Sequence, residues 1–185
     1  MKPQEIVSST RHALTATVEA VTGFAKLERV LAVVCSCTPA LLIWFDDGPI
    51  RNTISDYYNM KQNQLFYVPL TVASMLFVVN GVVKKKHFYN TLLGVMLAGA
   101  LLFNVDDFTT LHAVFAIGFF GGNAVVIVWK SPRKELGFKL LLVALIALAI
   151  IGWLFLGWYS LFWAEWASLG IIAVHYILES LDLID

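Results

Sequence analysis

The chain has 185 residues, of which 59% are hydrophobic and 14% are charged, and its formal net charge is zero. Its mean hydropathy is +0.76. A soluble protein of this size could not cover its surface with so few charged residues, so the composition excludes an ordinary soluble domain and predicts that the bilayer is its solvent. The lack of net positive charge also argues against nucleic acid as a partner.

Residues 1–26 are too polar to cross a bilayer. Apolar residues such as Val18, Val21 and Phe24 recur in this segment with loose helical spacing, which predicts a cytoplasmic or interfacial amphipathic helix. The segment lacks the compact order of charged, apolar and small residues found in a cleaved signal peptide, so we expect the first span to act as a signal anchor. The predicted transmembrane domain covers residues 27–185.

Six apolar runs follow, and each is long enough, or nearly so, to cross a bilayer as a helix of about 20 residues. All six are expected to be helical, because an open strand would leave backbone groups unpaired in lipid. The fold class is therefore an all-α integral membrane bundle of six transmembrane helices. The predicted spans are Leu27–Phe45, Leu65–Val83, Phe88–Phe103, Leu111–Trp129, Phe138–Gly157 and Trp163–Leu181.

The basic residues indicate how the bundle is oriented. With the N-terminus in the cytoplasm, 11 of the 13 basic residues are cytoplasmic, and the exceptions are Arg51 and Lys61. An even number of spans returns the C-terminus to the same side. We therefore predict a multi-pass protein of the bacterial inner membrane, N-in and C-in. Its expected partners are membrane lipids and, along apolar helix faces, a second copy of the chain or a larger membrane complex.

Acidic residues and a histidine gather at the opposite, outer ends of the spans. Carboxylates and a histidine at one depth suit a divalent metal such as zinc, and they equally suit general acid–base catalysis. A bound metal could activate water against a lipid headgroup or acyl bond, while a hydroxyl group holds the developing oxyanion. The alternative is that these residues are only the solvated ends of helices. The predicted metal ligands are Asp107, His112 and Glu165, and the predicted catalytic residues are Ser55, Tyr58 and Asp106.

A second polar pair lies on the last span. His175 and Glu179 are four residues apart and therefore share one helix face. Ionisable residues within a span usually face the bundle interior. A neutral His175 bonded to Asn80 or Asn123 is the structural alternative, and Glu179 could simply be solvated at the inner end. The remaining histidines lie at other depths, which argues against haem.

Three short segments carry a resemblance to known families: Ile54-Ser55-Asp56-Tyr57-Tyr58, Leu111-His112-Ala113-Val114-Phe115 and Ala164-Glu165-Trp166. Together they resemble a broad group of uncharacterised bacterial six-helix membrane proteins. More distantly, the pattern looks like the alkaline ceramidases and adiponectin-receptor-like proteins, which are metal-dependent lipid amide hydrolases. Those proteins have seven spans and a His-x-x-x-His pair in the last one, where this chain has His175-x-x-x-Glu179. The resemblance implies lipid hydrolysis.

The sequence leaves three functions open. The first is a non-catalytic membrane subunit or lipid-binding scaffold, suggested by many small residues and apolar faces. The second is a metal-dependent lipid hydrolase that uses the outer cluster. The third is a small transporter, whose polar path would depend on Asn80, Asn123 and His175.

Overall fold

The structure of the chain is a computed structural model that describes residues 25–83, 88–129 and 131–184. These residues form six α-helices and one short 3₁₀ helix, and they contain no strand. The amphipathic helix predicted within residues 1–26 lies almost entirely outside them. The helices are α2 (Ala25–Phe45), η1 (Ser55–Asn59), α3 (Gln64–Val83), α4 (Tyr89–Leu102), α5 (Thr109–Val128), α6 (Arg133–Leu154) and α7 (Leu161–Ser180).

The apolar runs of the sequence coincide with these α-helices, which confirms the all-helical prediction. Five of the helices are long and apolar enough to cross a membrane. The other is α4, whose 14 residues extend about 21 Å at 1.5 Å per residue, less than the roughly 30 Å of a bilayer core. Helix α6 begins at Arg133 rather than at the predicted Phe138. Its charged first turns remain helical because Glu135 pairs with Lys134 at 3.3 Å and with Lys139 at 3.6 Å.

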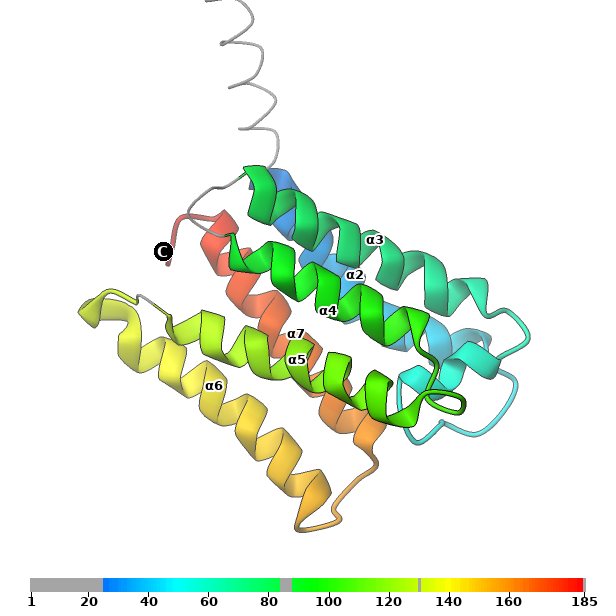
Figure 1. Cartoon of the computed structure of the whole chain (residues 1–185). Coiled ribbons are helices and arrows are strands. Elements are labelled where there is room, and N and C mark those ends of the chain that lie inside the picture. Colours follow the sequence, from blue (N-terminus) through cyan, green and yellow to red (C-terminus); the bar gives the residue numbers. More distant parts are fainter. Residues whose placement is uncertain (1–24, 84–87, 130, 185) are drawn as a thin grey trace, which may run out of the picture.

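The six helices form a closed ring in which each helix packs against its neighbours in the chain and α7 returns to pack against α2 (Figure 1). Successive helices run antiparallel (Figure 1), so the ring has two ends. We call the end with connections 46–63, 103–108 and 155–160 the acidic end. The basic end is where α2 begins, α7 ends, and the α3–α4 and α5–α6 connections lie.

Small residues allow α3 and α4 to approach closely. The Ser74 hydroxyl on α3 donates a 2.8 Å hydrogen bond to the carbonyl of Gly94 on α4. A Cβ atom added to Gly94 would lie 2.7 Å from the Ser74 carbonyl oxygen, and one added to Gly81 would lie 2.3 Å from the Thr91 nitrogen. Glycine at these two positions is therefore what lets the backbones touch.

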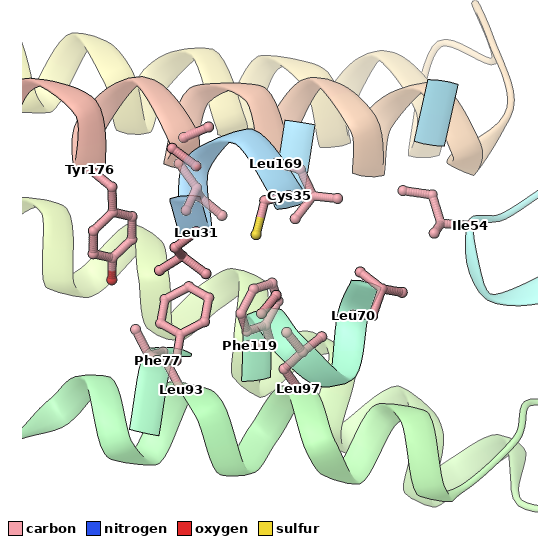
Figure 2. Close-up of a cluster of buried hydrophobic side chains, with 14 of the residues drawn as sticks. Leu31, Cys35, Ile54, Leu70, Phe77, Leu93, Leu97, Phe119, Leu169 and Tyr176 are labelled. Atoms are coloured by element: carbon pink, nitrogen blue, oxygen red, sulfur yellow. The ribbon is translucent and has the colours of Figure 1, made fainter. Parts of the chain in front are cut away.

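The core lies on the axis of the ring. Figure 2 shows apolar side chains of α2, α3, α5 and α7 pointing toward this axis. Phe77 is at its centre and is fully buried. Its ring meets Phe119 edge to face at a centroid distance of 5.5 Å and Tyr176 at 5.4 Å. We call these three rings the aromatic layer.

Candidate functional site

All six residues that the sequence singled out for catalysis or metal binding lie at the acidic end. Ser55 and Tyr58 belong to η1, and Asp106 and Asp107 lie in the α4–α5 connection. His112 is in the first turn of α5, and Glu165 is in the second turn of α7. The six residues thus lie at one end of the ring, and the contacts of each one decide what it can do.

Five polar side chains at this end line one small crevice: Ser55, Tyr58, Tyr67, Asn104 and His112. The Tyr58 hydroxyl donates a hydrogen bond to the Asp106 carboxylate, which also accepts one from the Asn59 amide at 3.2 Å. The bond to Asp106 raises the pKa of Tyr58. The α4–α5 connection is thereby tied to η1, and three of the predicted residues come together around the crevice.

His112 is held in a defined orientation. Its Nδ1 lies 3.0 Å from the carbonyl oxygen of Ala100 and 2.9 Å from that of Phe103. Both partners are acceptors, so Nδ1 carries a proton, and in the neutral tautomer that this fixes the lone pair lies at Nε2. A histidine oriented in this way can act as a base or as a ligand.

Glu165 anchors the acidic-end loop, residues 46–63, inside the ring. Only 8% of the glutamate is exposed, and its Oε2 accepts a 2.7 Å hydrogen bond from the Ile54 backbone N–H. Next to it, the Phe162 N–H donates to the Asn52 carbonyl at 2.6 Å. Ile54 and Tyr57 are buried at the mouth of the bundle as a result. The long loop is therefore a plug rather than a free connector.

Arg51 stabilises the same loop from within. Its Nε donates to Asp46 at 2.7 Å, and its Nη1 donates to the Asp56 carbonyl at 2.9 Å. The guanidinium carbon lies 5.3 Å from the centroid of the Tyr57 ring. Sequence reasoning saw Arg51 only as an exception to the charge rule. The hydrogen bond from Arg51 lowers the pKa of Asp46.

The predicted metal site is not assembled. Among residues 25–83, 88–129 and 131–184, no group of three His, Cys, Asp or Glu residues could hold a metal ion. Asp107 instead closes the α4–α5 turn, because its carboxylate accepts from the Asn104 amide at 2.8 Å. Glu165 is bonded to the loop and His112 to helix carbonyls. The three proposed ligands thus serve three separate structural contacts, and the structure gives no support for zinc.

A second polar cluster lies at the basic end, and it was not predicted from the sequence. Tyr176 donates its hydroxyl to Asn90 Oδ1 at 2.9 Å, and Asn90 donates its amide to Asn80 Oδ1 at 3.1 Å. Asn80 in turn donates to Glu28 Oε1 at 2.7 Å. The four residues come from α7, α4, α3 and α2. We call them the buried polar chain.

The members of the buried polar chain are almost fully enclosed. Their exposed fractions are 0% for Glu28, 1% for Asn90, 2% for Tyr176 and 5% for Asn80. Every donor points in the same direction, from Tyr176 toward the Glu28 carboxylate. A carboxylate within an apolar bundle is expensive to bury and is by default a candidate functional group.

Other ionisable residues are buried close to the same end. His175 is 5% exposed and Glu179 is 8% exposed. Glu179 is therefore buried inside the ring. The sequence had left open that it is solvated at the inner end of the last span. The signal that could have identified the buried polar chain was present in the sequence, since Glu28 falls within the first predicted span and Asn80 and Asn90 fall within two others.

These features define the class of protein before any relative is considered: a helical bundle with five helices able to span a membrane and buried polar groups at both ends. The chain belongs to a family of unknown function, DUF7103, whose model matches residues 37–180. No curated protein matches the chain. No solved structure matches it either. The resemblance to the alkaline ceramidase superfamily stays a prediction.

Proposed function

We propose that the chain is a six-helix protein of the bacterial inner membrane, with the basic end in the cytoplasm and the acidic end outside. The sorting of Lys and Arg to the basic end supports this orientation. Helix α4 is short, and the flanking Phe88 and Phe103 extend its apolar length. The exposed apolar side chains of all six helices would contact lipid, a second copy or another membrane protein.

Within this frame, we propose that the protein binds a small cation or a proton inside the bundle and passes it between the two sides. The observation that supports this proposal is the buried polar chain, in which three hydrogen bonds lead from Tyr176 through two asparagines to Glu28. The run of donors ends on a carboxyl oxygen of Glu28, which accepts the last hydrogen bond, and a carboxyl group of this kind can bind a cation or a proton. The proposed function is thus non-catalytic, and it develops the transporter reading of the sequence.

Energetics favour a functional role for Glu28 over packing alone. Burial of a carboxylate carries a desolvation penalty of several kcal/mol, and replacement by apolar residues is often neutral or stabilising. Interhelical amide and hydroxyl hydrogen bonds can hold membrane helices together without any charge. Asn80, Asn90 and Tyr176 could serve that purpose alone, and the Glu28 carboxyl adds an ionisable group to them inside the bundle.

The test is a flux assay on the full chain in proteoliposomes. An imposed cation or pH gradient is followed with an entrapped dye, first for the wild type and then for Glu28→Gln. We expect Glu28→Gln to reduce flux to the level of protein-free vesicles. The matched control is Asp47→Asn, because Asp47 is exposed in the acidic-end loop and its neutralisation should leave flux unchanged.

Two outcomes of the flux assay would contradict the proposal. A wild type with no flux above protein-free vesicles for protons or any monovalent cation would exclude transport. Flux that is equal in wild type and Glu28→Gln would leave the buried polar chain as helix–helix contact only, as in a lipid-binding scaffold. A size-exclusion profile of the detergent-solubilised variant identifies misfolding.

One observation favours a second function, hydrolysis of a lipid ester at the acidic end. Ser55 and His112 line the same crevice, and His112 presents Nε2 as a base. In such a reaction Ser55 Oγ would attack the carbonyl carbon while Nε2 takes its proton. The alcohol would leave with that proton, and water would then release the acid. Labelling by a fluorophosphonate that is lost in Ser55→Ala would support this function, and the absence of labelling would exclude it.

A further inference from the structure

A small cavity lies inside the ring, next to the acidic-end loop. Its volume is about 50 Å³, and side chains of this loop and of α2, α3, α4, α5 and α7 line it. In Figure 2, Cys35 lies on one side of this region, and Leu70 and Leu97 lie on the other. Apart from the Cys35 thiol, the polar side chains of the lining are those of Ser55 and Glu165.

The lining favours an uncharged ligand. A charged group loses its hydration when it enters an apolar space, and it needs a counter-charge in return. Glu165 is the one carboxyl group of the lining, and its Oε2 already accepts the Ile54 N–H at 2.7 Å. The rest of the wall is mostly apolar and includes Leu70 and Phe119. An apolar group gains free energy by leaving water for such a space, so the cavity suits an alkyl group.

The volume of the cavity limits the length of that alkyl group. A water molecule needs roughly 10–15 Å³ of such volume, so 50 Å³ admits roughly four non-hydrogen atoms. A chain of about three carbons with one terminal oxygen therefore fills the space. A longer chain would have to push the walls apart, which close packing opposes.

The polar crevice of the acidic end adjoins the cavity. Four residues line both spaces: Ser55, Phe66, Ala100 and Leu101. Ser55 is half-buried on this shared wall, and within residues 25–83, 88–129 and 131–184 its hydroxyl makes no hydrogen bond. A polar atom that enters the cavity beside an alkyl group therefore finds a hydroxyl ready to bond with it.

We propose that the cavity binds a short-chain alcohol, with its alkyl group in the cavity and its hydroxyl group at Ser55. The polar groups of the lining are a hydroxyl and a carboxyl, and an alcohol both donates and accepts, so it can bond with each of them. The inference goes beyond the proposed function, because it uses neither Glu28 nor transport. It gives the acidic end a ligand of its own.

The test is a titration of the full chain with n-propanol, followed by NMR of isotope-labelled alanine methyl groups in detergent micelles. Ala100 lines the cavity, whereas Ala149 lies on α6, which contributes nothing to the lining. Binding at the site shifts the Ala100 methyl signal to saturation, while partition of alcohol into the micelle shifts both signals without saturating. Two further ligands complete the series. n-Hexanol tests the size limit, and n-propyl fluoride has the size of n-propanol but lacks its O–H donor.

We expect n-propanol to give a saturating shift at Ala100 and none at Ala149, and n-hexanol to give no saturating shift. n-Propyl fluoride should bind about three- to tenfold more weakly than n-propanol, as the loss of one neutral hydrogen bond implies. Ser55→Ala should reduce this difference and leave the affinity for n-propyl fluoride unchanged. Ala116→Leu fills the cavity and should abolish saturation, with the Ala149 signal at its wild-type position as the check on folding.

Three results would overturn the inference. An Ala100 shift that never saturates, or that matches the shift of Ala149, would mean that alcohol enters only the micelle. Saturating binding of n-hexanol as tight as that of n-propanol would show that the cavity does not set the size of the ligand. An undiminished preference for n-propanol in Ser55→Ala would remove the contact with Ser55. The proposed transport fails separately, through equal flux in wild type and Glu28→Gln, and Glu28→Gln should bind n-propanol as the wild type does.

Discussion

The buried polar chain makes a quantitative prediction at its central member. Asn90 accepts from Tyr176 and donates to Asn80, so Asn90→Leu removes two interhelical hydrogen bonds. Leucine fills a similar volume, which keeps any new cavity small. Interhelical hydrogen bonds in membrane proteins contribute roughly 0.6–1.7 kcal/mol each, so two of them amount to about 1–3 kcal/mol. Both former partners stay buried, which places the effect toward the upper part of that range.

The assay is reversible unfolding of the full chain in mixed micelles, titrated with SDS and followed by tryptophan fluorescence. Asn90→Leu should unfold at a clearly lower SDS fraction than the wild type. The control is Asn59→Ala, which removes one exposed 3.2 Å hydrogen bond and should shift the midpoint little. If Asn90→Leu and the control unfold together with the wild type, then the hydrogen bonds of Asn90 do not hold the helices and the reasoning is wrong.

Three further predictions concern the helix contacts and the acidic-end loop. Gly94→Leu should destabilise the same unfolding transition by about 1–3 kcal/mol, since its side chain meets the α3 backbone, whereas Gly121→Ala, which has open space, should be neutral or slightly stabilising. Arg51→Gln should raise the pKa of Asp46 toward its ordinary value, measured by NMR titration of the carboxyl carbon. Because the Asp46 pKa is lowered in the folded chain, the pair stabilises the loop above the ordinary aspartate pKa, and this contribution fades as pH falls through the lowered value. Glu165→Leu should release the loop, seen as faster tryptic cleavage there, and an unchanged cleavage rate would show that the glutamate is not its anchor.

The helices could be predicted from the sequence because the signal is local. An apolar run of about 20 residues is bounded by charges and turns, so its ends are visible in the chain itself. The start of helix α6 is the exception. Helix α6 begins at Arg133, before the apolar run, because Glu135 and Lys139 neutralise each other one turn apart. A rule based on hydropathy alone places the start of that helix too late.

The contacts within the sites could not be predicted, because they depend on which helices are neighbours and how each is rotated. The six acidic-end residues lie at one end of the ring, yet Asp107 bonds to Asn104 and Glu165 bonds to Ile54, which the metal hypothesis did not foresee. Glu28 stands between Lys26 and Arg29, where it reads as part of a solvated helix end. Only the packing of α2 against α3 and α7 shows that it is buried.

The aromatic layer ties the two polar ends together, and this constrains how transport could work. Phe77 packs edge to face against Phe119 and Tyr176, so three rings meet in the core between the acidic-end loop and Glu28. Tyr176 takes part in both structures, because its ring belongs to the layer and its hydroxyl donates to Asn90. In the proposed transport, a cation that crosses the layer would displace one of these rings, and rotation of the Tyr176 ring would break its hydrogen bond to Asn90. Conversely, a cation or proton that binds Glu28 changes the acceptor at the far end of the same chain of donors. In the proposed function, opening of the axis and occupancy of Glu28 would therefore be linked through Tyr176.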